Sequence, residues 1–582
     1  MWNQKDLMRT LLKVLVIFVF YLTPFYLSAK PVDIALDQVG YRIDDEKDFR
    51  VARQVAAFQI RDEQNSIVFE GKLSGPIHDQ YAGCDVWRGV FTDLKTPGTY
   101  TVQMEGGDRS WPFRIGNDIY QPLLQAALRG LYVSRCGYAV KDDAVGHPPC
   151  HMRDGAFMLV GGKKIADGRD ATGGWHNGGD YWRSTMSAAQ TVSRLLWPVE
   201  MFPDSFDNIP SRLLPKERCG DWPDLLTEAR WGLEWLAKMQ GADGGVSTGV
   251  GPYPARMPPM VPPQNDSTVH FIGAVHSSNT AKVGAVFARA ARILKARDPA
   301  FARACLNHAR SCWNYLLANS QPVTPRTCAT YVKQEDETDR LWLAVELFRT
   351  TAEREFQEDF LKRFTRLQSS YPPAPVITHT IRNFNLHEAL ISYCFIRKDA
   401  DQAVQQNILA GLQADCDRMV TTALTEGYGC VLTAENWKQR HTMGTALQMA
   451  WELVMAFELT GQVRYRDTSL QQLHFVLGAN PLGKVFVTGV GSNPVRNPHY
   501  RPCSIKNQTP LGLLVKGPTY DEKFLACTLK QRPTPPPEKA YVDSSIAHQC
   551  NEPDIEVQGH LIGLSAYFYA TGSRMLLNKA SP

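Results

Sequence analysis

Short β-prone runs separated by turn residues make up the segment from about residue 31 to residue 115. Each run is rich in Val, Ile, Phe, Tyr and Thr, and glycine, proline or aspartate punctuates the intervals, which is typical of strands joined by tight turns. The runs cover residues 50–52, 57–60, 67–71 and 99–103. The pattern predicts a small β-sandwich domain over residues 31–116.

From about Tyr120 the pattern changes to long stretches in which apolar residues recur every three or four positions. This period places the apolar side chains on one face of a helix. The clearest stretches are residues 225–240, 279–296, 302–317, 339–351 and 442–460. We therefore expect an all-helical domain over residues 120–580. Periodicity alone does not distinguish a closed ring of helices from an open helical array.

The N-terminus has the layout of a secretory signal peptide over residues 1–29. Lys5, Arg9 and Lys13 precede an apolar run at residues 14–22, and small residues follow at Ser28 and Ala29. The alternative is an uncleaved anchor, because the apolar stretch at 11–27 is near the lower limit for crossing a bilayer. We expect a secreted or periplasmic protein, held at the membrane if the segment is not cleaved.

Composition narrows the range of partners. The chain has 582 residues, 44% of them hydrophobic, and its 63 basic and 59 acidic residues leave a formal charge of only +4. A balanced charge argues against nucleic acid as a ligand, and no stable protein partner is implied. Thirteen cysteines are an odd number for an exported chain, so at least one thiol is free, paired between chains or bound to metal.

One glycine-rich turn carries both a possible metal ligand and a possible catalytic carboxylate. It spans residues 173–181, Gly-Gly-Trp-His-Asn-Gly-Gly-Asp-Tyr. The segment resembles the Asp-x-Gly-Asp signature of family 9 glycoside hydrolases, in which both acidic residues hold the water that attacks the sugar. Here Asn177 stands at the first acidic position, and Asp180 is the candidate base. Taken alone, Asp180 is also compatible with a turn or helix N-cap aspartate.

The resemblance extends over nearly the whole chain. Residues 36–41 and 96–100 look like the first strand and the closing turn of the immunoglobulin-like module found in one branch of the family. The resemblance therefore implies a mainly α protein, with an (α/α)6 barrel catalytic domain preceded by a small immunoglobulin-like β-sandwich. It also implies an exported, inverting hydrolase of β-1,4-linked glucan.

Two later segments resemble the rest of the family's active site. Residues 480–502 match a family signature that contains His499 and Arg501, which in relatives reach sugar hydroxyls and the region of the acid or base. The alternative for both residues is a network that only orders the loop. Glu552 follows Cys550 and Asn551 in a segment that resembles the one carrying the family's acid. Inverting hydrolysis needs such an acid opposite the base, with room for a water between them.

Cys136, Cys150, His151 and His176 provide two thiols and two imidazoles, a set that suits a closed tetrahedral zinc centre. Their spacing resembles the zinc site beside the cleft in the same branch of the family, where four protein ligands make the metal structural. The alternative is a disulfide between the two cysteines with two ordinary histidines.

A calcium site is a second metal prediction, over residues 331–339. Glu335, Asp336 and Asp339 supply hard oxygen ligands there. An acidic helix start has the same appearance.

Asn177 bears on how active the protein is as a hydrolase. Its carbonyl oxygen can still accept a hydrogen bond from water, but it carries no charge, so Asp180 should ionise more easily and be a weaker base. We therefore expect weaker turnover than in relatives. Residues 553–560 also depart from the usual endoglucanase sequence. Three functions follow: an endoglucanase, an exo-acting β-glucosidase or glucosaminidase on short oligosaccharides, and a catalytically silent carbohydrate-binding protein.

Overall fold

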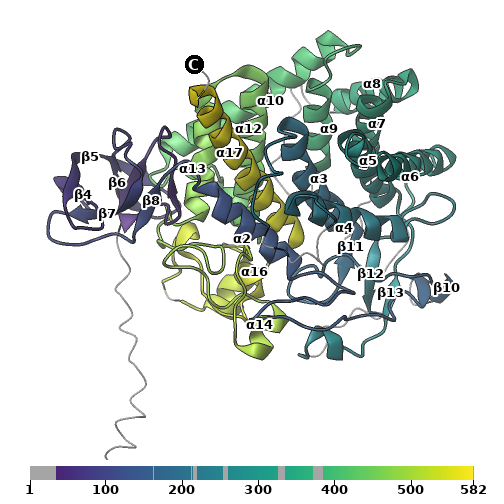
Figure 1. Cartoon of the computed structure of the whole chain (residues 1–582), viewed down its shortest axis with the longest axis horizontal. Helices are drawn as coiled ribbons and strands as arrows, with labels where there is room; N and C mark the ends of the chain where they lie inside the picture. Colours follow the sequence, from purple (N-terminus) through teal and green to yellow (C-terminus); the bar gives the residue numbers. More distant parts are fainter. Residues whose placement is uncertain are drawn as a thin grey trace, which may run out of the picture.

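The computed structural model describes residues 34–160, 163–211, 213, 219–252, 260–324, 335–370, 384–531 and 533–580. A sandwich of β-strands lies against one side of a larger helical body (Figure 1). The predicted signal segment, residues 1–29, lies outside the described residues. Within the described part of the chain, no helix is both long enough and apolar enough to span a bilayer.

The N-terminal domain is a β-sandwich with its own apolar core, which includes Tyr41, Phe49 and Phe113. Its eight strands follow the order β1-β3-β6-β5-β4-β7-β8-β2. The long strand β5 joins the two layers, because it pairs with β4 up to Lys72 and with β6 from Leu73 onward. The strands are β1 (Ile34–Ala35), β2 (Gly40–Tyr41), β3 (Asp48–Val51), β4 (Ala57–Arg61), β5 (Ile67–Asp79), β6 (Cys84–Val90), β7 (Gly98–Met104) and β8 (Phe113–Ile115).

The expected first strand at residues 36–41 is wrong, because the chain turns between β1 and β2. The Asp37 carboxylate accepts hydrogen bonds from the backbone N–H groups of Val39 (2.7 Å) and Gly40 (3.0 Å), which forms a local turn. Gly40 has φ of 131°, a value that side-chain-bearing residues rarely adopt.

This turn is one of the attachments between the two domains. The second carboxylate oxygen of Asp37 lies 2.6 Å from Nδ1 of His474 in the helical domain. The Gln38 side chain accepts hydrogen bonds from the backbone N–H groups of Ser492 (3.0 Å) and Asn493 (2.8 Å). The β-sandwich therefore holds the loop that leads to His499.

The helical domain is an (α/α)6 barrel. Among the described residues, six helices form a closed inner ring in which α3 contacts α5, then α7, α9, α12 and α17, and α17 returns to α3. Each inner helix has an outer neighbour, respectively α4, α6, α8, α10, α13 and α2. The inner helices are α3 (Thr185–Met201), α5 (Ser277–Leu294), α7 (Glu337–Thr351), α9 (Phe384–Cys394), α12 (Thr442–Thr460) and α17 (Ile555–Ala580).

The outer helices are α2 (Tyr120–Tyr132), α4 (Asp224–Met239), α6 (Pro299–Ala318), α8 (Arg354–Ser370), α10 (Gln402–Thr425) and α13 (Val463–Val476). Short helices α11 (Ala434–Trp437), α14 (Arg501–Lys506), α15 (Glu522–Phe524) and α16 (His548–Asn551) lie in the connections.

Local sequence signals fix several helix ends. Asp298 caps α6 by accepting from the N–H of Phe301 at 2.9 Å, and Pro299 follows as the first helical residue. Gly461 ends α12 in the left-handed conformation, with φ of 71°. The predicted helices at 225–240, 302–317 and 442–460 therefore match α4, α6 and α12 within a few residues.

The inner ring encloses buried charges as well as apolar side chains. Arg289 on α5 contacts Glu346 on α7 (2.5 Å) and Glu388 on α9 (2.7 Å), and Arg194 on α3 also pairs with Glu388. Each carboxylate is matched by guanidinium groups, as burial of charge requires. These pairs tie four of the six inner helices together.

The expectation that residues 120–580 are entirely helical is wrong, because five short strands form a second sheet. The strands follow the order β10-β9-β13-β12-β11. Helical periodicity cannot reveal them, since each occupies only a few residues inside a connection. They are β9 (Phe157–Val160), β10 (Lys163–Asp167), β11 (Arg183–Ser184), β12 (Gly249–Pro252) and β13 (His270–Ile272). Strand β11 begins two residues after Tyr181, the last residue of the turn 173–181, and so helps to place it.

Candidate active site and metal centre

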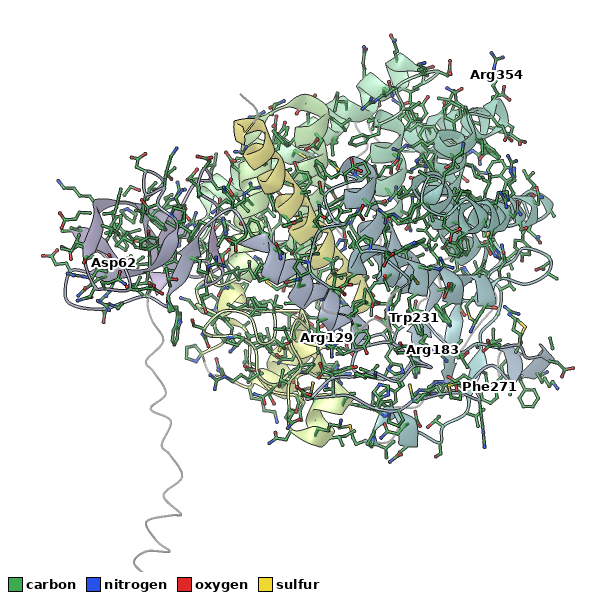
Figure 2. All side chains as sticks on the ribbon, viewed as in Figure 1. Asp62, Arg129, Arg183, Trp231, Phe271 and Arg354 are labelled. Carbon is green, nitrogen blue, oxygen red and sulfur yellow. The ribbon has the colours of Figure 1, made fainter. Side chains whose placement is uncertain are left out.

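The turn 173–181 is fixed by its neighbours before any ligand is considered. The Trp231 indole, from α4, donates to the carbonyl of Gly174 at 2.9 Å, and Arg183, from β11, donates to the carbonyl of Gly173 at 2.9 Å; both side chains are labelled in Figure 2. Backbone pairing also joins Cys136 N to the Gly174 carbonyl (2.9 Å).

Two glycines let the turn approach the opposite side of the site. A Cβ on Gly178 would lie 2.7 Å from Oε1 of Glu552, and one on Gly179 would lie 2.3 Å from the His499 ring. Gly178 also has φ of 74°, which disfavours any residue with a side chain. Glycine at both positions is therefore required by space, and at 178 by backbone conformation.

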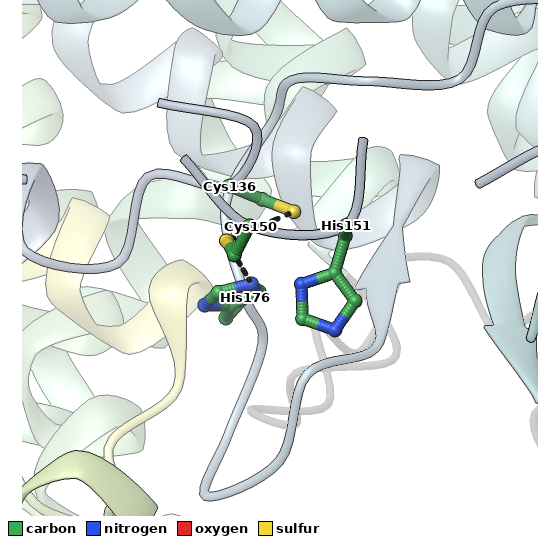
Figure 3. Close-up of side chains that lie close together, drawn as sticks. All are labelled: Cys136, Cys150, His151 and His176. Atoms are coloured by element: carbon green, nitrogen blue, oxygen red, sulfur yellow. Dashed lines mark hydrogen bonds between the residues drawn. The ribbon is translucent and has the colours of Figure 1, made fainter. Parts of the chain in front are cut away.

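Cys136, Cys150, His151 and His176 come together in a buried cluster (Figure 3). One ligand atom from each lies within 4.8 Å of the others, and the two Sγ atoms are 3.9 Å apart. That separation is far too long for a disulfide of about 2.05 Å. It is close to the roughly 3.8 Å expected between two thiolates that each lie about 2.3 Å from a tetrahedral zinc. The disulfide alternative is therefore wrong for this pair.

The chemistry of the cluster also fits a metal. Burial holds the pKa of His176 well below its usual value, which keeps the imidazole neutral as a ligand must be. His151 has a left-handed backbone with φ of 53°, a conformation that costs about 1–3 kcal/mol and persists where the surroundings enforce it. Two soft thiols and two imidazoles match the preference of zinc.

A second group, formed by His151, Asp266 and His270, continues from the cluster. Nε2 of His151 lies 3.4 Å from Asp266, and the His151 and His270 rings stack with centroids 4.9 Å apart. A carboxylate in this place orients a metal-bound histidine. Asp266 and His270 are not predictable from the sequence pattern, because more than a hundred residues separate them from His151 and no local motif connects them.

The acidic residues predicted to bind calcium have cationic partners. Asp336 pairs with Arg340 at 2.9 Å, and Asp339 lies 3.6 Å from Nζ of Lys282. Residues 331–334 of that segment lie outside the described residues. Ion pairing explains both carboxylates, and calcium binding stays a prediction.

Asp180 lies at the end of the turn and is half-buried. Burial raises the pKa of this carboxyl to about 7; the hydrogen bond from the Trp182 N–H (2.9 Å) opposes that effect, and the charge of Glu552 adds to it. A carboxylate that retains its proton up to neutral pH is a stronger base than an exposed aspartate.

Glu552 reaches the same turn from the other end of the chain. Its Oε1 atom accepts a hydrogen bond from the N–H of Gly179 at 2.8 Å, next to Asp180. Its Oε2 atom contacts the ammonium group of Lys516, which also lies 3.2 Å from Asp554. Lys516 and Asp554 were not among the predicted site residues, since neither belongs to a recognisable motif.

His499 and Arg501 contact the turn rather than pointing into open space. The N–H of His499 donates to the carbonyl of Asn551 at 2.8 Å, and its Nδ1 contacts the carbonyl of Ser545. Arg501 is buried and donates to the carbonyl of Gly179 at 2.7 Å. These contacts order the loops around Glu552 and Asp180, and contact of either side chain with a sugar stays a prediction.

Asn177 uses both ends of its amide to join three parts of the barrel. Its Nδ2 donates to the hydroxyl of Ser187 on α3 at 3.1 Å, and its Oδ1 accepts from the N–H of Ile555, the first residue of α17, at 3.1 Å. An aspartate could accept from Ile555, but it could keep the Ser187 contact only by accepting from the hydroxyl instead of donating to it. In this structure the amide therefore has a definite role in holding the turn.

Comparisons with known proteins agree with this architecture. Residues 120–565 match the model of glycosyl hydrolase family 9, and residues 29–109 match that of the cellulase N-terminal ig-like domain. Endoglucanase D of Acetivibrio thermocellus is 28% identical over 477 residues, covering 80% of this chain and 74% of the relative. A cellodextrinase of Butyrivibrio fibrisolvens is 28% identical over 540 residues, covering 89% and 96%.

Solved structures show the same fold. The chain aligns with a metagenome-derived glycoside hydrolase family 9 endoglucanase with a TM-score of 0.81 and 32% identity, covering 92% of this chain and 99% of the other. A Zn-binding triple mutant of the family 9 endoglucanase J30 aligns with a TM-score of 0.82 and 28% identity, covering 90% and 99%.

Zinc binding by Cys136, Cys150, His151 and His176 can be tested by substitution. We expect the purified protein to contain about one zinc per chain, and Cys150→Ser to lose it, because a serine hydroxyl is a poor ligand for zinc. Metal release should also lower the melting temperature, since the metal binds only the folded state. Elemental analysis and thermal unfolding with and without a chelator measure both effects.

The matched control is Cys305→Ser, which changes a buried free thiol on α6 outside the cluster. Its zinc content should equal that of the unmodified protein. Full zinc content in Cys150→Ser would contradict the assignment.

Proposed function

The chain belongs to glycosyl hydrolase family 9, and on this premise we propose that it hydrolyses β-1,4-glucosidic bonds in cellulose or a related β-glucan, as an inverting endo-β-1,4-glucanase. The observation that carries the proposal is the contact between Glu552 and Gly179, which brings a second carboxylate beside Asp180. Two carboxyl groups, one acting as base and the other as acid, are the requirement of inverting hydrolysis.

We assign Asp180 the role of base and Glu552 that of acid. Asp180 takes a proton from a water molecule, whose oxygen attacks the anomeric carbon while the bond to the glycosidic oxygen breaks. Glu552 gives its proton to the departing oxygen, so that one sugar leaves with a new hydroxyl and the other carries the water oxygen on the opposite face. Exchange with solvent then returns both carboxyl groups to their starting states.

The metal cluster serves this site indirectly. Four protein ligands leave zinc no open coordination position, so we assign the metal a structural role. Cys136 and Cys150 precede the turn and His176 lies within it, so their shared metal would pin the turn that presents Asp180. We further propose export from the cell, on the basis of the N-terminal sequence.

The name of one relative bears on the length of the substrate. The Butyrivibrio fibrisolvens protein, similar over 89% of this chain, is named a cellodextrinase. This similarity favours short β-1,4-linked oligosaccharides as additional substrates. The third possibility from the sequence, a silent binding protein, would keep the fold and metal without turnover.

The first experiment measures reducing ends released from soluble carboxymethylcellulose. We expect release by the unmodified protein, and a loss of at least about a hundredfold in Glu552→Gln, because proton donation contributes about 10² to 10⁴ in rate. Products from cellohexaose distinguish internal cleavage from removal of end units. Tight oligosaccharide binding with no product over long incubation would instead support the silent binder.

The pKa of Asp180 predicts the pH dependence. A base must be ionised to act, and burial raises the pKa of this carboxyl to about 7. We therefore expect kcat/KM to fall about tenfold per pH unit as the pH decreases below about 7. A profile measured on a soluble oligosaccharide tests this. An acidic limb near pH 4, the range of an exposed aspartate, would contradict the role given to Asp180.

Replacing Asn177 tests whether this position limits turnover. In Asn177→Asp the new carboxylate can still accept from Ile555, and its charge should raise the pKa of Asp180 further. We expect kcat/KM to rise about tenfold or more, with the acidic limb moved to higher pH.

Asn177→Ala is the control for loss of the amide contacts, and it should lower activity without moving the limb upward. No gain in hydrolysis by Asn177→Asp would remove the idea that the asparagine weakens the enzyme.

A further inference from the structure

Lys516 places a buried positive charge between two carboxylates at the candidate active site. Its Nζ atom contacts Oε2 of Glu552 and lies 3.2 Å from Oδ2 of Asp554. Only a small fraction of the lysine side chain is exposed, 7%. Burial would lower the pKa of this ammonium group, but Asp554 and Glu552 raise it well above the usual value. Lys516 therefore remains charged at every pH at which the enzyme would act.

The backbone holds this lysine in place. Its N–H donates to the carbonyl of Glu552 at 3.2 Å, and its own carbonyl accepts from the N–H of Met443 at 3.0 Å. The next residue, Gly517, donates to the carbonyl of Cys550 at 2.9 Å. The ammonium group is thus fixed relative to Glu552 by contacts on both sides, and not by the ion pair alone.

Asp554 is the permanent counter-ion of Lys516. Burial would raise the pKa of its carboxyl, but Lys516 and His441, whose Nδ1 lies 3.1 Å away, lower that pKa to about 2. An ionised Asp554 partly balances the charge of the lysine, so Glu552 contacts a cation that already has a second carboxylate partner.

Other charged and titratable groups face this region from the surrounding elements. They are Asp180 on the turn, His499 and Arg501 around the start of α14, His548 on α16, Glu556 on α17, and Arg440 and His441 before α12. Among the groups described, Lys516 is the cation that directly contacts Glu552. The pair it forms with Asp554 is the closest source of charge to the proposed acid.

We propose that Lys516 and Asp554 are positioning residues that strengthen Glu552 as the acid of the reaction, an inference that rests on the proposed function. As Glu552 gives its proton to the departing oxygen it becomes negatively charged, and the fixed ammonium group stabilises that charge. Because the stabilisation grows during the step, it favours the transition state over the ground state. Asp554 limits the effect, because it shares the positive charge of Lys516 with Glu552.

Two substitutions should shift the pH profile in opposite directions. Lys516→Met removes the cation, so Glu552 retains its proton to higher pH, and the alkaline limb of kcat/KM on cellohexaose should move up by about 1–3 pH units. Asp554→Asn leaves the cation unmatched, and the alkaline limb should move down by at least about one unit. A residue that only maintains the fold would not produce shifts of opposite sign.

A second substrate separates acid catalysis from general damage. The leaving group of 2,4-dinitrophenyl β-cellobioside needs little protonation, so Lys516→Met should lose much less activity on it than on cellohexaose. Lys516→Arg keeps the charge and should retain an alkaline limb close to that of the unmodified enzyme. Lys438→Met, which removes an exposed lysine paired with Glu435 at 2.7 Å, is the matched control and should change neither profile.

The inference would be overturned if the alkaline limb of kcat/KM lay at the same pH in the unmodified enzyme, in Lys516→Met and in Asp554→Asn. Equal losses of activity in Lys516→Met on cellohexaose and on 2,4-dinitrophenyl β-cellobioside would also overturn it. If Lys516→Met does not fold, as judged by thermal unfolding, the Asp554→Asn and Lys516→Arg profiles decide alone. If the unmodified enzyme releases no product from either substrate at any pH, the proposed function itself fails, which is distinct from failure of this inference.

Discussion

The hydrogen bond between Gly179 and Glu552 joins residues that are 373 positions apart, and the organisation of the site depends on it. The contact is possible because the inner ring closes: α17 returns to α3, so the segment before α17 meets the turn before α3. Glycine at 178 and 179 then allows the two segments to approach, since a Cβ at either position would collide with Glu552 or His499. The contact between Gly179 and Glu552 therefore needs both the closed barrel and glycine at positions 178 and 179.

Two carboxylates and one lysine carry the charge next to this contact. Asn177 stands where the segment that resembles the family signature would have its first acidic residue. Its neutral side chain holds α3 and α17 to the turn. Negative charge instead lies at Asp554, where Lys516 and His441 compensate it. The result is a site in which Asp180 titrates near neutrality because it is buried, while a fixed ion pair adjoins Glu552.

Much of the fold could be predicted from the sequence, because periodicity reports which face of an element is buried. Helices such as α4 and α12 were located within a few residues, since apolar positions repeat and local caps mark the ends. The second sheet was missed because strands such as β11 are only two residues long. The site was predictable where one segment carries several functional residues, as at His176 and Asp180. Lys516, Asp266 and His270 join the site only through tertiary contacts, which no local pattern records.

The attachment of the β-sandwich has a consequence for how this protein can be divided. The Gln38 side chain accepts hydrogen bonds from the backbone N–H groups of Ser492 and Asn493, a few residues before His499. Asp37 binds His474 near the end of the outer helix α13. The N-terminal domain thus supports the segment that leads to His499. Its removal would leave the backbone N–H groups of Ser492 and Asn493 and the imidazole of His474 without these partners, so the loop before His499 would lose part of its support.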